Sequence, residues 1–307
     1  MKQAILALLA VAVLSAADDR LLVAERVIGV TRESSWTRVA AVPVGFRTFH
    51  PQGMVKIGDA IFVSSVEVTV PTVRFARPVG GYDRDTGAGV GHLFKIDLQG
   101  RKLAELTLSA GAVYHPGGID YDGANIWVPL SEYRPDSHSI IYKVDPTSMT
   151  ATEVLRFPDS IGAIVHNTDD RTLHGVSWGS RRFYRWTLDR AGRVTNASTP
   201  PERLRTLNTS HYVDYQDCKY AGRRRMLCTG LAELRQTPGA VPFRLGGLDL
   251  IDLVDGRPIH QVPVPLWTPT GTDMTHNPVW IEPTPDGLRA YFMPEDDQST
   301  IYIYDVK

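Results

Sequence analysis

The chain repeats one pattern five times, and this repeat limits the possible folds more than any other feature of the sequence. Each copy has a strand-like run, a turn at Gly or Asp, a more apolar run ending near an acidic residue, and two further strand-like runs around a second turn. The copies start roughly 46 to 65 residues apart, and none contains a convincing helix. Four short strands per repeat predict an all-β fold, a five-bladed β-propeller.

The two ends of the chain predict how the ring closes. The fifth copy reaches Lys307 before a fourth strand can form, whereas residues 37–44 precede the first copy, where other copies place their outermost strand. We predict that residues 37–44 complete the last blade, which would remove the open edges of the first and last sheets. A six-bladed ring with residues 21–30 in an extra blade is the alternative.

The first 17 residues have the pattern of a signal peptide. Lys2 precedes an apolar run at 4–14, which is too short to span a bilayer, and Ser15-Ala16-Ala17 supplies the small residues of a cleavage site. We predict cleavage after Ala17 and a single propeller domain at 18–307, secreted or periplasmic. A buried N-terminal strand or helix is the alternative.

Charge and motifs narrow the possible partners. The formal net charge is −1, so the composition does not favour nucleic acid or an anionic membrane as a partner. We also expect the protein to be a monomer. The sequence has no phosphate loop, nucleophile elbow, dinucleotide fingerprint or HExxH motif. Function must therefore be inferred from where the repeat places its side chains.

The two cysteines lie on opposite arms of one expected hairpin, which turns at residues 221–223. Neighbouring positions on paired strands can come within disulfide distance, and an oxidising compartment favours the bond. We predict a Cys218–Cys228 disulfide; two buried thiols are the alternative.

The repeat also predicts a cluster of histidines and acids at one face. In antiparallel blades, the start of the innermost strand and the end of the second strand lie at the same face. The imidazoles expected around the mouth of the central channel are His50, His115, His211 and His276. The carboxylates expected just outside them are Glu67, Glu132 and Glu233, with Glu295 or Asp297 in the fifth copy.

Neutral imidazoles suit a transition metal, with zinc or iron expected first, and carboxylates behind them fix the imidazole tautomer. Histidines that only bridge strands, and histidines that act as acid or base on a substrate without a metal, are the alternatives. The loops that emerge at this face carry arginines, whose guanidinium groups match carboxylates and phosphates. The candidate substrate-binding residues are Arg74, Arg77, Arg134, Arg181 and Arg235. Ordinary solvated loop charge is the alternative to an anionic ligand.

Three phrases, FHPQGM, YHPGGIDYDG and IWVPLSEYRPDSHSIIYKVDP, resemble a family of secreted propeller proteins known only as a domain of unknown function. This resemblance implies the fold and no activity. Gln52-Gly53 followed by Glu67 is also similar to the first blade of the plant-type glutaminyl cyclases. That family consists of five-bladed propellers with a metal in the channel. The similarity therefore implies a functional site at the face of this propeller that carries the expected histidines and glutamates.

Two functions follow from this sequence. The first is a metal-dependent hydrolase or lyase that acts on a small or carbohydrate-like anionic substrate, with Glu67, Glu132 or Glu233 orienting ligands or moving protons. The second is a propeller that binds a ligand or a protein without catalysis and uses its histidines structurally. A converging pocket of His and Glu would favour the enzyme, whereas a channel plugged by apolar side chains would favour the binding platform.

Overall fold

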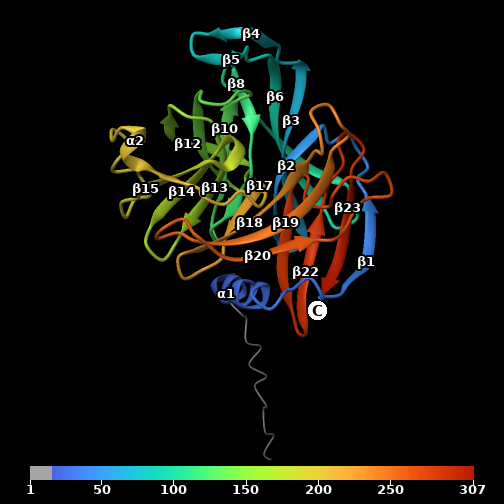
Figure 1. Ribbon diagram of the computed structural model, residues 1–307. Coiled ribbons are helices and arrows are strands. Elements are labelled where there is room, and N and C mark those ends of the chain that lie inside the picture. The colour runs from blue at the N-terminus through green and yellow to red at the C-terminus, as the bar shows by residue number, and fades with distance from the viewer. Residues whose placement is uncertain (1–15) are drawn as a thin grey trace, which may run out of the picture.

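The computed structural model describes residues 16–307, so most of the expected signal peptide lies outside the described residues. Residues 36–306 form five sheets, which surround a common axis as the blades of a propeller (Figure 1). The prediction of a five-bladed all-β propeller is confirmed.

Each blade has four strands in meander order, from the axis outward. The first blade contains β2 (His50–Ile57), β3 (Ala60–Val70), β6 (Ala88–Asp97) and β7 (Lys102–Leu108). The second contains β8 (Val113–Pro116) with β9 (Asp120–Tyr121), then β10 (Ile126–Glu132), β11 (Ser139–Asp145) and β12 (Thr150–Phe157). The third contains β13 (Ile161–Asn167), β14 (Thr172–Ser177), β15 (Arg182–Thr187) and β16 (Arg205–Leu207).

The last two blades complete the ring. The fourth contains β17 (Asp214–Tyr220), β18 (Arg225–Leu234), β19 (Phe243–Asp252) and β20 (Pro258–Val264). The fifth contains β21 (Val279–Thr284), β22 (Gly287–Phe292), β23 (Thr300–Val306) and, outermost, β1 (Trp36–Pro43). Because β1 pairs antiparallel with β23, placing Val42 opposite Ile301, the predicted closure is confirmed.

The repeats were expected to lack a convincing helix, and the longest helix of the described residues lies before the first repeat. Residues 16–27 form helix α1 (Ala16–Val27), so they do not contribute to a sixth blade, and α2 (Pro201–Leu204) and the 3₁₀ turn η1 (Trp178–Ser180) are shorter. The side chains of Val23, Ala24 and Val27 follow helical spacing and are buried against the fourth and fifth blades. None of the helices between residues 16 and 307 is long and apolar enough to cross a membrane.

The cores lie between neighbouring blades. Between the second and third blades, for example, Trp127, Phe157 and Trp186 pack together in one cluster. The hairpin of β17 and β18 places Cys218 directly opposite Cys228, and the two are joined in a disulfide, as predicted. A separate hairpin, β4 (Arg74–Val79) and β5 (Tyr82–Arg84), stands away from the ring at the end opposite α1 (Figure 1).

Glycines close the propeller axis. A Cβ atom on Gly53 would lie 2.5 Å from the Ile119 nitrogen, and one on Gly118 would lie 2.8 Å from Asp217 Cα, so these backbones touch only because both residues lack side chains. Gly118 N–H also donates to Gly162 O (2.8 Å). The glycines in the first two repeats therefore bring innermost strands into contact.

Asp217 reinforces this closure from the fourth blade. Its fully buried carboxylate accepts the backbone N–H groups of Met54 (2.9 Å) and Ile119 (3.1 Å), which belong to the first and second blades. Lys219 forms an ion pair with the same carboxylate. Backbone contacts and the Asp217–Lys219 ion pair thus close the axis. They separate the mouth at one face of the propeller from the opposite face, where α1 lies.

Candidate active site

Strand register decides which predicted histidines reach the mouth of the axis. His50 pairs with Val66 and His115 with Ser131, each one residue before the repeated glutamate, so these two positions are equivalent, as predicted. In the fourth blade the corresponding position is Asp214, which pairs with Leu231. The expectation that His211 and His276 also start innermost strands is wrong, because both precede their strands, β17 and β21, by three residues.

His50 and His115 form the centre of the site. His50 Nδ1 donates to Asp296 Oδ1 (2.8 Å), since a carboxylate can only accept, and this leaves His50 Nε2 as the other available nitrogen. The two imidazole ring centroids are 6.4 Å apart. His115 is only 7% exposed, and its buried Nε2 has no hydrogen-bond partner in residues 16–307. An unpartnered buried nitrogen is costly, which makes this atom a candidate ligand contact.

Burial and neighbouring charges set the protonation states of His115 and Asp296. Burial, together with the nearby charge of His50, lowers the pKa of His115 to about 3, so its imidazole is neutral at physiological pH. Although burial opposes ionisation of Asp296, the hydrogen bond and charge of His50 lower the pKa of Asp296 below its usual value. The mouth therefore combines an ionised carboxylate, an imidazole held by it and a second, neutral imidazole.

Aromatic side chains form one wall of the mouth. The ring of Tyr133 stacks on His115 with a centroid separation of 4.3 Å, and Trp178 lies 6.0 Å from His115. The Arg84 guanidinium lies 5.8 Å from the Trp178 ring centroid and forms an ion pair with Asp83. This wall offers flat apolar surface with one cationic group at its edge.

A second acidic group, Asp273, lies in the segment between β20 and β21. Asp273 is fully buried, and neither of its carboxylate oxygens has a hydrogen-bond partner among the described residues. His276 Nδ1 lies 3.5 Å from Asp273 Oδ1. Asn277 Nδ2 donates to Asp296 Oδ1 (3.1 Å), which links this segment to the His50 carboxylate.

The other predicted residues are largely engaged with one another. Arg181 donates to His211 Nδ1 (2.8 Å) and forms an ion pair with Asp214, so His211 is an acceptor in a surface network. Glu132 holds Arg134 at 2.6 Å, and Glu233 holds Arg235 at 3.2 Å.

Three predicted residues lie towards the edge of this face. Glu67 is 3.8 Å from His92 Nε2, Arg74 is paired with Asp83 at 2.9 Å, and Arg77 is exposed on β4. The predicted carboxylates thus mainly position side chains, and the predicted arginines at this face are mostly paired with acids.

The residues present fit a metal only in part. His50 and His115 are close enough to face one another, and Asp296 supports His50 as a carboxylate behind a ligating imidazole would. His211 Nδ1 accepts from Arg181, and His276 Nδ1 lies 3.5 Å from Asp273 Oδ1. In the part of the chain that the structure describes, no group of three or more His, Cys, Asp and Glu side chains is placed to hold an ion.

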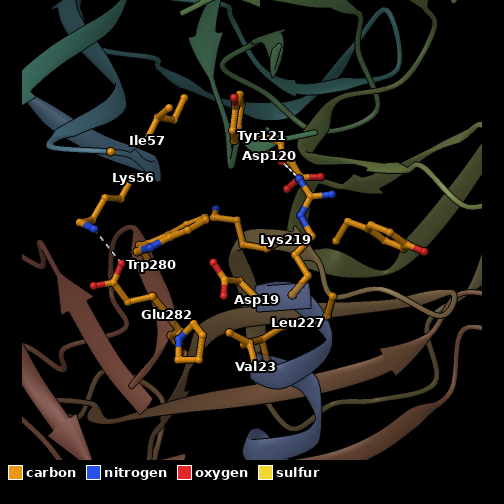
Figure 2. A pocket seen from close by; sticks show the side chains of 16 residues that line it. Asp19, Val23, Lys56, Ile57, Asp120, Tyr121, Lys219, Leu227, Trp280 and Glu282 are labelled. Carbon is orange, nitrogen blue, oxygen red and sulfur yellow. Dashed lines mark hydrogen bonds and ion pairs between the residues drawn. The ribbon is translucent and has the colours of Figure 1, made fainter. Parts of the chain in front are cut away.

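A second hollow lies on the far side of the closed axis, under α1. This cavity of about 250 Å³ is surrounded by side chains from α1 and from the ends of innermost strands (Figure 2). Three of its charged side chains have partners: Lys56 pairs with Glu282 at 2.8 Å, Lys219 pairs with Asp217, and Arg20 donates to the Tyr121 carbonyl. Asp19 of α1 lines the same cavity. The Arg20 contact attaches α1 to the second blade, and the Lys56 contact links the first and fifth blades.

Asp296, Tyr133 and Trp178 are the site residues that the sequence analysis missed. Asp296 lies between the two acids proposed for the fifth copy, and Tyr133 directly follows a predicted glutamate. Trp178 occupies the position of Val66 in the third blade, because Ile161 pairs with Ser177 as Pro51 pairs with Ser65. Aligning the repeats by register would have found Trp178, whereas the loop geometry that selects Asp296 is not visible in the sequence.

Several solved structures are similar to this chain. They include a glutaminyl cyclase from Myxococcus xanthus and a luciferin-regenerating enzyme. Each has 10% identity and a TM-score of 0.47, and each match covers 89% of this chain and 97% of the other. Hydrazine synthase from Kuenenia stuttgartiensis matches at 14% identity and a TM-score of 0.39, covering 82% of this chain and 58% of its own. At these levels the similarity carries no inference about activity.

A comparison with curated proteins gives no significant match. The model of DUF6454, a family of unknown function, matches residues 5–307, which is nearly the whole chain. The resemblance noted from FHPQGM and the related phrases is therefore confirmed, and the chain belongs to the DUF6454 family.

Proposed function

We propose that the mouth formed by His50, His115 and Asp296 is the active site of a hydrolase or lyase that acts on a small or carbohydrate-like anionic substrate. The observation that carries this proposal is the hydrogen bond from His50 Nδ1 to Asp296, beside a neutral imidazole whose buried Nε2 has no partner in residues 16–307. A carboxylate behind an imidazole is a common arrangement for a general base.

The two histidines would have different tasks. His50 Nε2 would take a proton from the substrate or from a water molecule, and Asp296 would stabilise the imidazolium that forms. His115, neutral across the physiological range, would donate or accept a hydrogen bond through Nε2 without competing for that proton. Tyr133 and Trp178 would hold the substrate against the wall of the mouth.

Support for an anionic substrate comes from two arginines near this wall. Arg84 lies beside Trp178, and Arg134 lies over the ring of Tyr82 with Cζ 3.5 Å from the centroid. Both guanidiniums are held by carboxylates, which fixes their position. A bound carboxylate, such as that of a uronate, would meet them at the rim.

The test is turnover by purified protein of uronate oligosaccharides and simple esters, followed by ultraviolet absorbance of a new double bond and by released acid. We expect His50→Gln to lower kcat at least 100-fold, as expected for loss of a general base. His211→Gln is the matched control, since His211 lies outside the pair, and it should keep activity. Equal activity of the wild type and His50→Gln would refute the assignment.

A metal site is the second candidate, because His115 Nε2 is unpartnered and His50 lies opposite it. Zinc or iron bound by these two histidines would supply a Lewis acid for the same substrate class. Elemental analysis of the wild type and of a His50→Ala, His115→Ala double variant decides this candidate. About one metal per chain that is lost in the folded variant would support it. Equal metal content in both proteins would refute it.

We also propose that the protein is exported. The support is the signal-peptide pattern of residues 1–17 together with the Cys218–Cys228 disulfide, a bond favoured in oxidising compartments. Intact mass measurement of protein recovered outside the cytoplasm should give a chain beginning at Asp18. A chain that keeps Met1 or Lys2 would contradict the proposal.

A further inference from the structure

A hollow beside the third blade is lined by more cationic than anionic side chains. It has a volume of about 380 Å³ and lies where β15, α2 and β16 face the turn between β19 and β20 of the fourth blade. Both α2 and β15 lie at the outer edge of the propeller (Figure 1). The hollow shares no lining residue with the cavity under α1 or with the mouth, so it is a separate site. Its charged and polar lining groups include Arg185, Arg203, Arg205, His174, Asn196 and Asp252.

Two local features of the third blade leave this space open. By strand register, His174 occupies the position of Phe62 in the first blade and of Trp127 in the second, and both of those rings are almost fully buried. A smaller, polar ring therefore stands where the other two blades have a large apolar one. In addition, β16 pairs only with residues 182–184 of β15, so no outer strand lies beside Arg185.

The three arginines that line the hollow lack acid partners. Other arginines of this region are neutralised, as in the ion pairs Arg182–Asp159, Arg193–Asp189 and Arg224–Asp170. Between residues 16 and 307, by contrast, the guanidiniums of Arg185, Arg203 and Arg205 form no ion pair and no side-chain hydrogen bond, and all three side chains are exposed. Like charges around one hollow repel one another, so a bound anion there would be stabilised by all three.

The remaining lining groups do not cancel this charge. Asp252 is the carboxylate of the hollow, and its Oδ1 accepts the Val254 N–H (2.7 Å) within its own turn. Three guanidiniums and one carboxylate give the lining a formal charge of +2. His174 is only 5% exposed, and burial lowers its pKa to about 3, so its imidazole adds no charge. Its Nε2 is bonded to Thr172 Oγ1 (3.0 Å), which leaves Nδ1 as the other available nitrogen.

We propose that this hollow binds a small tetrahedral oxyanion with two negative charges, which is phosphate or sulfate, either free or as a monoester. The formal charge of the lining matches such a dianion, and guanidinium groups bind its oxygens in pairs of parallel hydrogen bonds. The ion pairs of Arg193 and Arg224 confine the positive charge to the hollow, which favours one small ligand over an extended polyanion. This site goes beyond the proposed hydrolase or lyase function and shares no residue with it.

The test is calorimetric titration of the full-length protein with inorganic phosphate, inorganic sulfate and acetate at constant ionic strength and about pH 8, where phosphate carries two charges. We expect phosphate or sulfate to bind with a Kd of about 1 mM or tighter, and acetate at least tenfold more weakly. An Arg185→Gln, Arg205→Gln variant should bind the dianion at least tenfold more weakly than the wild type and keep its Tm, because both side chains are exposed. The matched control is Arg32→Gln, Arg190→Gln, which removes the same charge from exposed positions outside the hollow and should keep the affinity.

A further variant tests the charge argument from the opposite direction. Asp252→Asn keeps an acceptor for Val254 and removes the negative charge, so it should bind the dianion about threefold more tightly. Affinity that is unchanged or weaker in this variant would contradict the charge argument.

The other outcomes are equally decisive. Binding that is lost in the Arg185, Arg205 variant and kept in the control would support the site, and the tighter of phosphate and sulfate would identify the class of ester. Equal weakening in both arginine variants would refute it, since the protein would then attract anions only through its overall charge. Failure of both phosphate and sulfate to bind, or equal affinity for acetate, would also overturn the proposal.

Discussion

Closure of the axis by glycines makes a sharp prediction about Gly117. Its amide donates to Pro129 O within the second blade, while its α-carbon faces the third blade. A Cβ atom placed on Gly117 would lie 2.6 Å from the Gly162 carbonyl carbon and closer still to its oxygen. Both are backbone atoms, so no side chain can turn aside, and the strands β8 and β13 must separate.

The magnitude follows from this contact. Overpacking in a core typically costs about 1 to 3 kcal/mol, and a clash with backbone belongs at the upper end, so we expect Gly117→Ala to lower the free energy of unfolding by about 3 kcal/mol. For a domain of this size that corresponds to a decrease in Tm of roughly 6 to 12 °C.

Gly162→Ala is the matched control on the opposite side of the same contact. Its Cβ would meet nothing nearer than 3.8 Å, so it should be neutral or raise stability by about 0.4 to 1 kcal/mol through the unfolded state. Guanidinium unfolding followed by tryptophan fluorescence gives both values. If Gly117→Ala unfolds within about 0.5 kcal/mol of the wild type, then the axis is not closed by backbone contact as described.

Three further predictions concern buried groups. Asp217→Ala removes the acceptor for Met54 and Ile119 and leaves Lys219 without its acid, so we expect a loss of about 3 to 5 kcal/mol in chemical unfolding, whereas Asp255→Ala at an exposed turn should change little. Burial lowers the pKa values of His115 and His174 to about 3, below the unfolded value of 6.5, so their contribution to stability is complete above pH 6.5 and is lost as pH falls towards 3. Each histidine should contribute a slope of about 1.4 kcal/mol per pH unit in this window, and identical slopes for His115→Gln and wild type between pH 6 and 4 would contradict the burial argument. The Cys218–Cys228 bond closes a loop with a sequence separation of 10, so replacing both cysteines by serine should cost about 3 kcal/mol, and a reductant should destabilise the wild type but not this variant.

The sequence by itself determined the blades, the closing strand and the disulfide. The blades and the closing strand follow from the phase of the repeat, and the disulfide follows from neighbours across one hairpin. The equivalence of His50 and His115 was also visible in the sequence, since each stands before a proline in the repeated phrase and precedes a glutamate by the same spacing. The register of their strands confirms it. Strand alternation carries this information within about 20 residues of chain, without reference to the rest of the molecule.

Only the tertiary structure decided which groups meet at the mouth. Asp296 accepts a hydrogen bond from His50 although the two residues are 246 positions apart in the sequence. Arg181, from the neighbouring blade, donates a hydrogen bond to His211. Bulges beside Pro51, Ile161 and Tyr215 shift the register at the same place in three innermost strands, and a propensity pattern does not reveal them. Loop positions and backbone contacts across the axis depend on how whole blades pack, and no local pattern in the sequence records that packing.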